Sequence, residues 1–99
     1  MSIVVRYAPT GLTRAQYDDV SRRMEEAGDW PPDGLDIHVL FGSEGDLRVS
    51  EIWDSEEQFR AFTERLLSVL SEVGVQIGGE PEVFEVHELQ KRSGGSPAP

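Results

Sequence analysis

The feature of the sequence that most constrains its fold is a helix-start signal that occurs twice, each time shortly after a run of β-branched residues. In this capping box a Ser or Thr side chain accepts a hydrogen bond from the backbone three residues on, where a Gln side chain reaches back. Thr13 with Gln16 forms the first box and Ser55 with Gln58 the second, with Asp54 as an alternative cap. Apolar residues at spacings of three and four follow each box, which is one face of a helix. The sequence therefore predicts two strand–helix units.

Four runs with β propensity complete the order of elements. They span residues 3–8, 35–41, 47–53 and 83–89, and the two helices are predicted to end at Gly28 and Gly74. The order β-α-β-β-α-β with a central hairpin predicts an α+β, ferredoxin-like fold, in which an antiparallel sheet carries both helices on one face. We expect one domain over residues 1–90 and a disordered tail over 91–99, which has no apolar anchor.

The charge of the chain restricts its partners. Nineteen acidic against nine basic residues give a net charge of −10, which repels phosphate backbones and anionic lipid, so we expect neither nucleic acid nor a membrane as a partner. There is no cysteine, the start of the chain does not resemble a signal peptide, and no apolar run is long enough to span a membrane, so the expected location is cytoplasmic. The two histidines have no metal-site spacing, and we expect no metal and no cofactor.

We expect the sheet face that carries no helix to pack against a partner. A chain of this length buries a thin core, and the face away from the helices carries apolar residues such as Val4, Leu40 and Ile52. We therefore expect a two-fold homodimer joined through that face.

Residues 49–59, with the sequence VSEIWDSEEQF, resemble the strand–helix junction of the dimeric α/β-barrel superfamily, and more narrowly of its antibiotic biosynthesis monooxygenase-like families. The shared pattern is an acid, a tryptophan, another acid and a capped helix with an early aromatic residue. The spacing of Gly34 and His38 is similar to this group as well. Haem-degrading members place a histidine on the helix after the tryptophan, where this chain has Glu64 and no histidine, and an asparagine on the first strand that is missing here.

The resemblance implies a homodimer that binds a small apolar or aromatic molecule. The activity it implies is cofactor-independent monooxygenation of a small aromatic or polyketide-like substrate. The alternative is a non-catalytic ligand-binding or interaction module on the same fold. Of the residues that such oxygenases combine in their pocket, only Trp53 carries over securely.

Six residues are candidates for the site, and each has a plain structural alternative. His38 could be a general base and Glu51 a proton-transfer group, or they could be a hydrogen-bonded histidine and a salt-bridged surface acid. The predicted substrate-binding residues are aromatic and could equally be core residues: Trp53, Tyr7, Phe59 and Phe62. His87 is expected to be structural or exposed.

The turn of the central hairpin decides whether His38 joins the other candidates. A three-residue loop at 43–45 would pair His38 with Ser50 and place it on the face opposite Trp53. The alternation of apolar residues in 35–41 favours this register. A two-residue turn at 43–44 would place His38 on the face of Glu51 and Trp53, which the resemblance favours. The sequence leaves both registers open.

Overall fold

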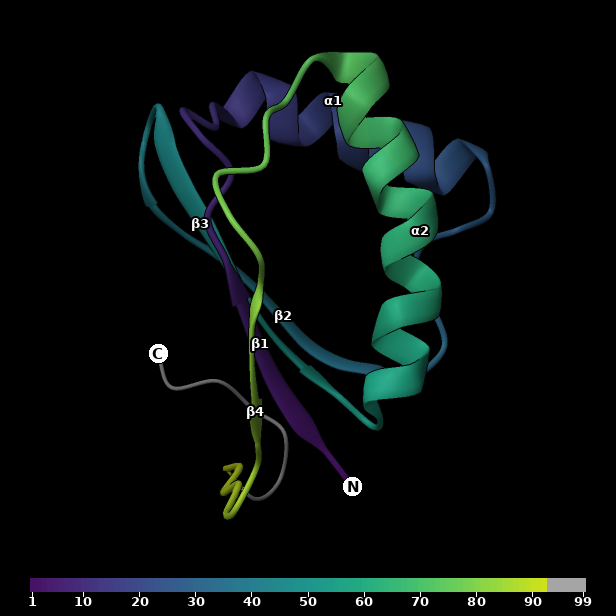
Figure 1. Cartoon of the computed structure of the whole chain (residues 1–99), viewed down its shortest axis with the longest axis vertical. Coiled ribbons are helices and arrows are strands. Elements are labelled where there is room, and N and C mark those ends of the chain that lie inside the picture. Colours follow the sequence, from purple (N-terminus) through teal and green to yellow (C-terminus); the bar gives the residue numbers. More distant parts are fainter. Residues whose placement is uncertain (93–99) are drawn as a thin grey trace.

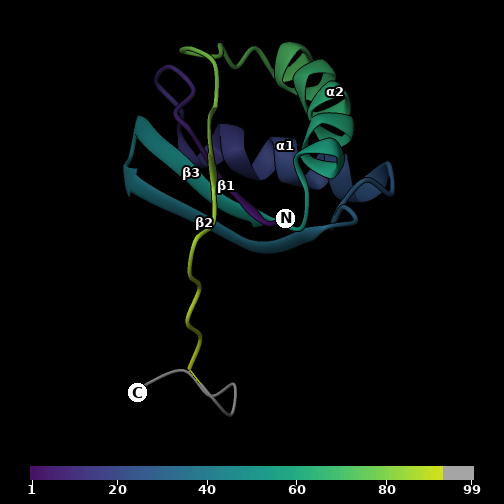
Figure 2. The same cartoon turned by 60° about the horizontal axis from the view of Figure 1, so that its bottom comes forward.

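The six elements follow one another in the predicted order. The computed structural model describes residues 1–92, and the elements are β1 (Ile3–Tyr7), α1 (Arg14–Glu26), β2 (Leu35–Ser43), β3 (Asp46–Trp53), α2 (Glu56–Val73) and β4 (Glu82–Glu85). The strands form one antiparallel sheet in the order β2-β3-β1-β4. Both helices lie on the same face of this sheet, and no helix among residues 1–92 covers the other face (Figures 1 and 2). This is the ferredoxin-like α+β fold.

The first capping box is confirmed and the second is half formed. Thr13 accepts from the backbone N–H of Gln16 at 3.1 Å, and the Gln16 side chain accepts from the N–H of Thr13 at 3.1 Å. Ser55, rather than Asp54, caps α2 and accepts from the N–H of Gln58 at 3.2 Å. The Gln58 side chain does not return this bond, because its Oε1 accepts from the Ser55 hydroxyl instead, at 2.9 Å. One hydrogen bond of the box is therefore enough to start α2.

The hairpin between β2 and β3 closes on a two-residue turn, Glu44–Gly45, one residue later than the shorter predicted turn. Ser43 pairs with Asp46, and His38 pairs with Glu51. The register that would have placed His38 opposite Trp53 is therefore wrong. The apolar alternation favoured the wrong register because it does not continue along β2. A register shift between Leu35 and Ile37 places the later apolar residues on the opposite sheet face from Leu35.

The open face of the sheet is apolar, but not through all the residues predicted. Val4 and Ile52 pair there across β1 and β3. Leu40 does not, because it packs against the buried core under the helices. After the shift in β2, the residues that alternate with His38 and Leu40 lie on the open face instead, and these are Ile37, Val39 and Phe41.

The fourth strand is shorter than predicted because its neighbour ends. Glu85 pairs with Ile3, the first residue of β1, and the N–H of Val86 still bonds to the carbonyl of Ser2 at 3.0 Å. Beyond this point β1 offers no further backbone to pair with. Of the predicted tail, residues 93–99 lie outside the described residues, and Lys91 forms an ion pair with Asp36 at 3.0 Å.

Neither helix is long and apolar enough to cross a membrane, in the stretch from residue 1 to 92.

Candidate functional site

Glu51 is a buried acid in the middle of the covered sheet face. Its residue exposure is 1%, and it stands on β3 two residues before Trp53. The Trp53 indole N–H donates to Oε1 at 3.1 Å, and Nδ1 of His38 lies 2.6 Å from Oε2. The Tyr7 hydroxyl makes a longer contact with the same Oε2 at 3.5 Å. Because a buried carboxylate is costly without donors, this convergence of three donors is what makes an acid stable here.

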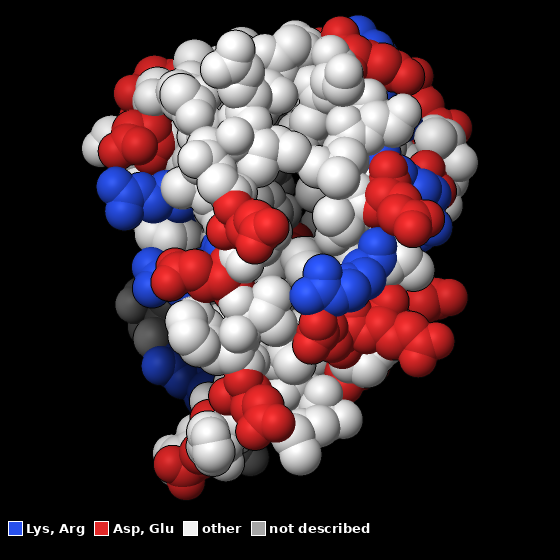
Figure 3. All heavy atoms as spheres, in the orientation of Figure 1, with Lys and Arg blue, Asp and Glu red and all other residues white. Residues whose placement is uncertain are grey.

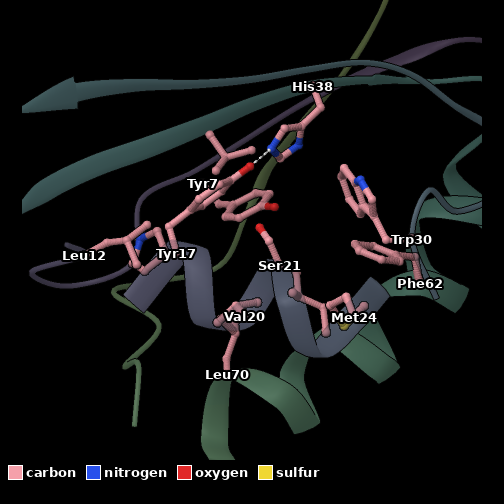
Figure 4. Close-up of a pocket in the computed structure, with 13 residues that line it drawn as sticks. Tyr7, Leu12, Tyr17, Val20, Ser21, Met24, Trp30, His38, Phe62 and Leu70 are labelled. Atoms are coloured by element: carbon pink, nitrogen blue, oxygen red, sulfur yellow. Dashed lines mark hydrogen bonds between the residues drawn. The ribbon is translucent and has the colours of Figure 1, made fainter. Parts of the chain in front are cut away.

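His38 links Glu51 to the inner face of α1. Its Nε2 lies 2.7 Å from the hydroxyl of Tyr17, which comes from the first turns of that helix (Figure 4). Burial, the largest cause, raises the pKa of the Tyr17 phenol above its usual value, so the hydroxyl keeps its proton. We assign the ring proton to Nδ1, because that nitrogen faces the Glu51 carboxylate, which can only accept. In the neutral ring, Nε2 then accepts from the Tyr17 hydroxyl.

A small cavity of about 50 Å³ lies directly in front of this pair (Figure 4). Trp30 packs edge-on against the His38 ring at a centroid distance of 5.0 Å and also contacts Phe62. The lining is aromatic and aliphatic apart from His38, Ser21 and the two tyrosine hydroxyls. It consists of Tyr7, Pro9, Leu12, Tyr17, Val20, Ser21, Met24, Trp30, His38, Val49, Phe62, Leu66 and Leu70.

A larger cavity of about 370 Å³ adjoins the small one and opens to the surface. Four residues line both cavities, so the two spaces meet there: Tyr7, Pro9, Leu66 and Leu70. The remaining walls come from α2 and from the segment that leads to β4, namely Phe59, Thr63, Leu67, Ile77, Gly79, Glu80 and Pro81. Figure 3 shows the molecule hollowed between these two regions, with mostly uncharged atoms around the hollow. A volume above 300 Å³ is typical of small-molecule sites.

The predicted site residues differ in how they stand to the two cavities. His38 and Phe62 line the small cavity, Phe59 lines the large one, and Tyr7 lines both. Glu51 lies behind His38, without lining either space.

Trp53 lies one layer deeper than predicted for a cavity wall. Within the part of the chain that the structure describes, it lines neither cavity, has no exposed surface, and packs against Phe59 and Phe62 at centroid distances of 5.7 and 5.4 Å. Its connection to the site is the hydrogen bond to Glu51. A direct contact between Trp53 and a ligand stays a prediction.

Tyr17, Ser21 and Trp30 line the small cavity and were not predicted from the sequence. A signal for the first two exists: Ser21 stands one helical turn after Tyr17, and a serine on an otherwise apolar helix face indicates a polar neighbour. Trp30 lies in the loop between α1 and β2, and no local pattern predicts its contact with His38.

Residues 1–92 contain no group of three or more acidic, histidine or cysteine side chains placed to hold a metal ion. His87 is exposed. The pairing of His38 with Glu51 supports proton transfer, because Nδ1 of the ring lies 2.6 Å from a buried acid.

Comparison with known proteins identifies the fold. No protein-family model and no curated protein sequence matches the chain. SnoaB from Streptomyces nogalater, a cofactor-independent oxygenase crystallised as a point mutant, has a similar structure with a TM-score of 0.64 and 14% identity, over 92% of this chain and 98% of that one. A provisionally assigned antibiotic biosynthesis monooxygenase from Chloroflexus aurantiacus has a TM-score of 0.63 and 14% identity, over the same shares of the two chains.

A designed protein, Foldit4, shares the fold as well, with a TM-score of 0.58 and 13% identity over 88% of this chain and all of that one. Identities this low show a common fold and not a common activity. The chain thus has the fold of the antibiotic biosynthesis monooxygenase-like proteins, as the resemblance at residues 49–59 predicted.

Proposed function

We propose that this protein binds a small phenolic aromatic molecule in the two adjoining cavities and oxidises it with molecular oxygen, without a cofactor. The observation that carries this proposal is the position of His38. Its Nδ1 lies 2.6 Å from the buried Glu51, and its Nε2, which we assign as the acceptor, lies at a cavity with aromatic walls. A fixed acceptor of this kind is a general base for a ligand hydroxyl.

The chemistry needs only a base, oxygen and a dry cavity. Nε2 of His38 takes the phenol proton, and the resulting phenolate is electron-rich enough to transfer an electron to O₂. A C–O bond then forms at a ring carbon, and the resulting peroxide takes the proton back from His38 to give a hydroperoxide. His38 next removes the proton of that ring carbon while the O–O bond breaks, and it passes this proton to the hydroxide that leaves, so phenol and O₂ become a quinone and one water. The apolar walls exclude bulk water. This exclusion favours the reaction of O₂ with the carbanion-like ring carbon of the phenolate.

The size and charge of the site indicate the class of ligand. An engineered cavity of about 150 Å³ holds one benzene ring, so a space of about 370 Å³ suits two or three fused rings. Glu80 is exposed at the rim of the larger cavity, and the chain carries a net charge of −10, which disfavours carboxylated ligands. A neutral, polyketide-like aromatic phenol fits both conditions.

The second candidate is binding without turnover. It is favoured by the larger cavity, whose lining is almost entirely apolar and does not include His38. The shared fold of SnoaB, a cofactor-independent oxygenase, supports the oxygenase, whereas the shared fold of a designed protein leaves both candidates open.

We further propose that two copies pair through the open sheet face, where six apolar side chains gather around β1, β2 and β3 and the adjacent β4: Val4, Ile37, Val39, Phe41, Ile52 and Phe84. The resemblance to dimeric barrels supports this. The cytoplasmic location stays a prediction.

The test measures oxygen uptake and ligand binding separately. A panel of bicyclic and tricyclic phenols and hydroquinones is screened for binding by fluorescence and for O₂ consumption above the buffer rate. We expect His38→Gln to lower the rate at least about 100-fold, with much smaller changes in affinity. His87→Gln is the matched control, because His87 is exposed. Binding without oxygen uptake would favour the binding module, and a panel without any bound member would overturn both candidates.

A further inference from the structure

Tyr17 occupies the one nitrogen that the proposed function needs. Its hydroxyl lies 2.7 Å from Nε2 of His38, and Nδ1 is already committed to Glu51 at 2.6 Å. A neutral imidazole has a single acceptor nitrogen with a single lone pair. A ligand hydroxyl can therefore reach the base only after the Tyr17 hydroxyl has moved away.

We infer that Tyr17 is a displaceable cap on His38, which makes it a specificity-determining residue: ligands whose hydroxyl replaces that of Tyr17 react, and ligands without such a donor bind with the cap in place. This inference rests on the proposed function, since it concerns how a phenol reaches the same base. Tyr17 itself is a phenol, so its contact with His38 has the geometry that a substrate phenol would adopt.

The space around His38 requires such a movement. The cavity in front of it measures about 50 Å³, far below the roughly 150 Å³ that holds one benzene ring. The larger cavity holds the rings but does not include His38 in its lining. A ring whose hydroxyl enters the small cavity must therefore displace one of its walls.

Tyr17 is the wall best placed to move. Its ring is only half-buried and stacks on His38 at 6.0 Å, with Arg14 on its outer side at 5.9 Å. Ser21, one turn further along α1, lines the same cavity and carries a hydroxyl that can accept from Tyr17 once it leaves His38. The deeper aromatic walls lack this freedom, because Phe62 is packed in the core with Trp53.

Because of the cap, we expect phenols and their ethers to differ in turnover rather than in binding affinity. An ether analogue leaves the Tyr17–His38 bond intact, so no acceptor is left unpaired and little affinity is lost. A phenol exchanges one hydrogen bond for another, so its hydroxyl also gains little. When Tyr17 lacks its hydroxyl, the ligand bonds to a vacant Nε2, and its hydroxyl should then improve affinity about tenfold.

The experiment compares 2-naphthol with 2-methoxynaphthalene, in which a methyl group replaces the hydroxyl hydrogen and so removes the donor. Fluorescence titration gives the ratio of their dissociation constants for the parent protein and for Tyr17→Phe. We expect a ratio near one for the parent and about tenfold in favour of the naphthol for Tyr17→Phe. Tyr7→Phe removes a hydroxyl from the same cavity but none from His38, so it should keep the parent ratio.

A second measurement avoids the substitution. The chain has two tyrosines, so 3-fluorotyrosine labelling yields two ¹⁹F signals, assigned with the Tyr7→Phe variant. Saturation with 2-naphthol should shift the Tyr17 signal strongly, and saturation with the ether should not. A ratio unchanged by Tyr17→Phe, or a Tyr17 signal that responds equally to both ligands, would overturn the cap while the proposed function stands. A parent protein that binds neither ligand would overturn both.

Discussion

Glu51 controls which nitrogen of His38 faces the cavity, and Trp53 controls the orientation of Glu51. The indole N–H can only donate, and it donates to Oε1, while Nδ1 of His38 faces Oε2. In a Glu51→Gln variant, the amide oxygen must face Trp53, so the amide NH₂ faces His38. The ring then accepts at Nδ1 and carries its proton on Nε2, where the base is needed.

We therefore predict that Glu51→Gln lowers oxygen uptake at least about 100-fold, because the acceptor nitrogen is lost from the cavity. Every buried hydrogen bond keeps a partner, so the free energy of unfolding should change by less than about 2 kcal/mol. Urea denaturation and the oxygen electrode measure the two effects. A variant with parental activity would show that the tautomer of His38 does not matter.

Residue types alone identified part of this site. A mid-strand histidine and an acid two residues before a tryptophan were recognisable as candidates, because both are costly to bury without a role. Whether the two residues pair depends on the hairpin register, and the apolar pattern of β2 favoured the other register. Tyr17 and Trp30 reach His38 only through the packing of α1 and its following loop across the sheet, which no local pattern encodes.

At the scale of elements, the β2–β3 hairpin positions the base, and two glycines hold its register. Gly45 has φ +81° at the second position of the turn, and a Cβ there would meet nothing within 4 Å. Gly42 has φ +109°, and a Cβ there would lie 2.7 Å from the backbone carbonyl oxygen of Asp46. Both need glycine for their backbone conformation, but only Gly42 also lacks space.

We predict that Gly45→Ala lowers the free energy of unfolding by about 1 kcal/mol, the cost of a left-handed backbone. Gly42→Ala should cost about 3 kcal/mol, because the backbone of β3 must also shift. Since this register pairs His38 with Glu51, Gly42→Ala should lower activity as well. Urea denaturation of the two variants is the comparison, and equal costs would contradict the account.

The elements themselves were largely predictable because their signals are local. Capping residues and terminal glycines set both helices to within a residue or two. The failures came from pairing. β4 ends early because its antiparallel neighbour β1 begins at Ile3, and Leu40 lies on the covered face because the hairpin register pairs it with Val49. Strand partners lie far apart in sequence, so no single segment predicts these outcomes.

At the scale of the whole molecule, the open sheet face predicts association. We expect light scattering to give a mass near twice the 11.0 kDa of one chain at micromolar concentration. Added salt should strengthen the dimer, because each copy carries a charge of −10. Val39→Glu places a charge on the open face and should yield monomers. Leu67→Glu is the control of matched exposure, 43% against 45%, on α2; a parent of monomeric mass would refute the interface.

The stability of the molecule should fall at alkaline pH because of Tyr7. Burial, and then the charge of Glu51, raise the pKa of this phenol well above its usual value near 10. The unfolded chain releases the proton from about pH 10 upward while the folded chain keeps it, so the stabilisation is complete below pH 10 and is lost as the pH rises further. Urea denaturation between pH 9 and 11.5 should show this decline, and Tyr7→Phe should flatten it. An equal decline in both proteins would point to other groups.

The central claim, that Glu51 fixes His38 as a base toward the cavity, is tested most directly by ¹⁵N NMR of the histidine ring nitrogens. The chain has two histidines, and His87→Gln leaves a single ring to observe. We predict a proton on Nδ1 and a bare Nε2 in the free protein, and a shift of Nε2 toward the protonated value when 2-naphthol saturates the site under argon. A free protein with its proton on Nε2, or a saturated complex in which neither nitrogen moves, would contradict the account.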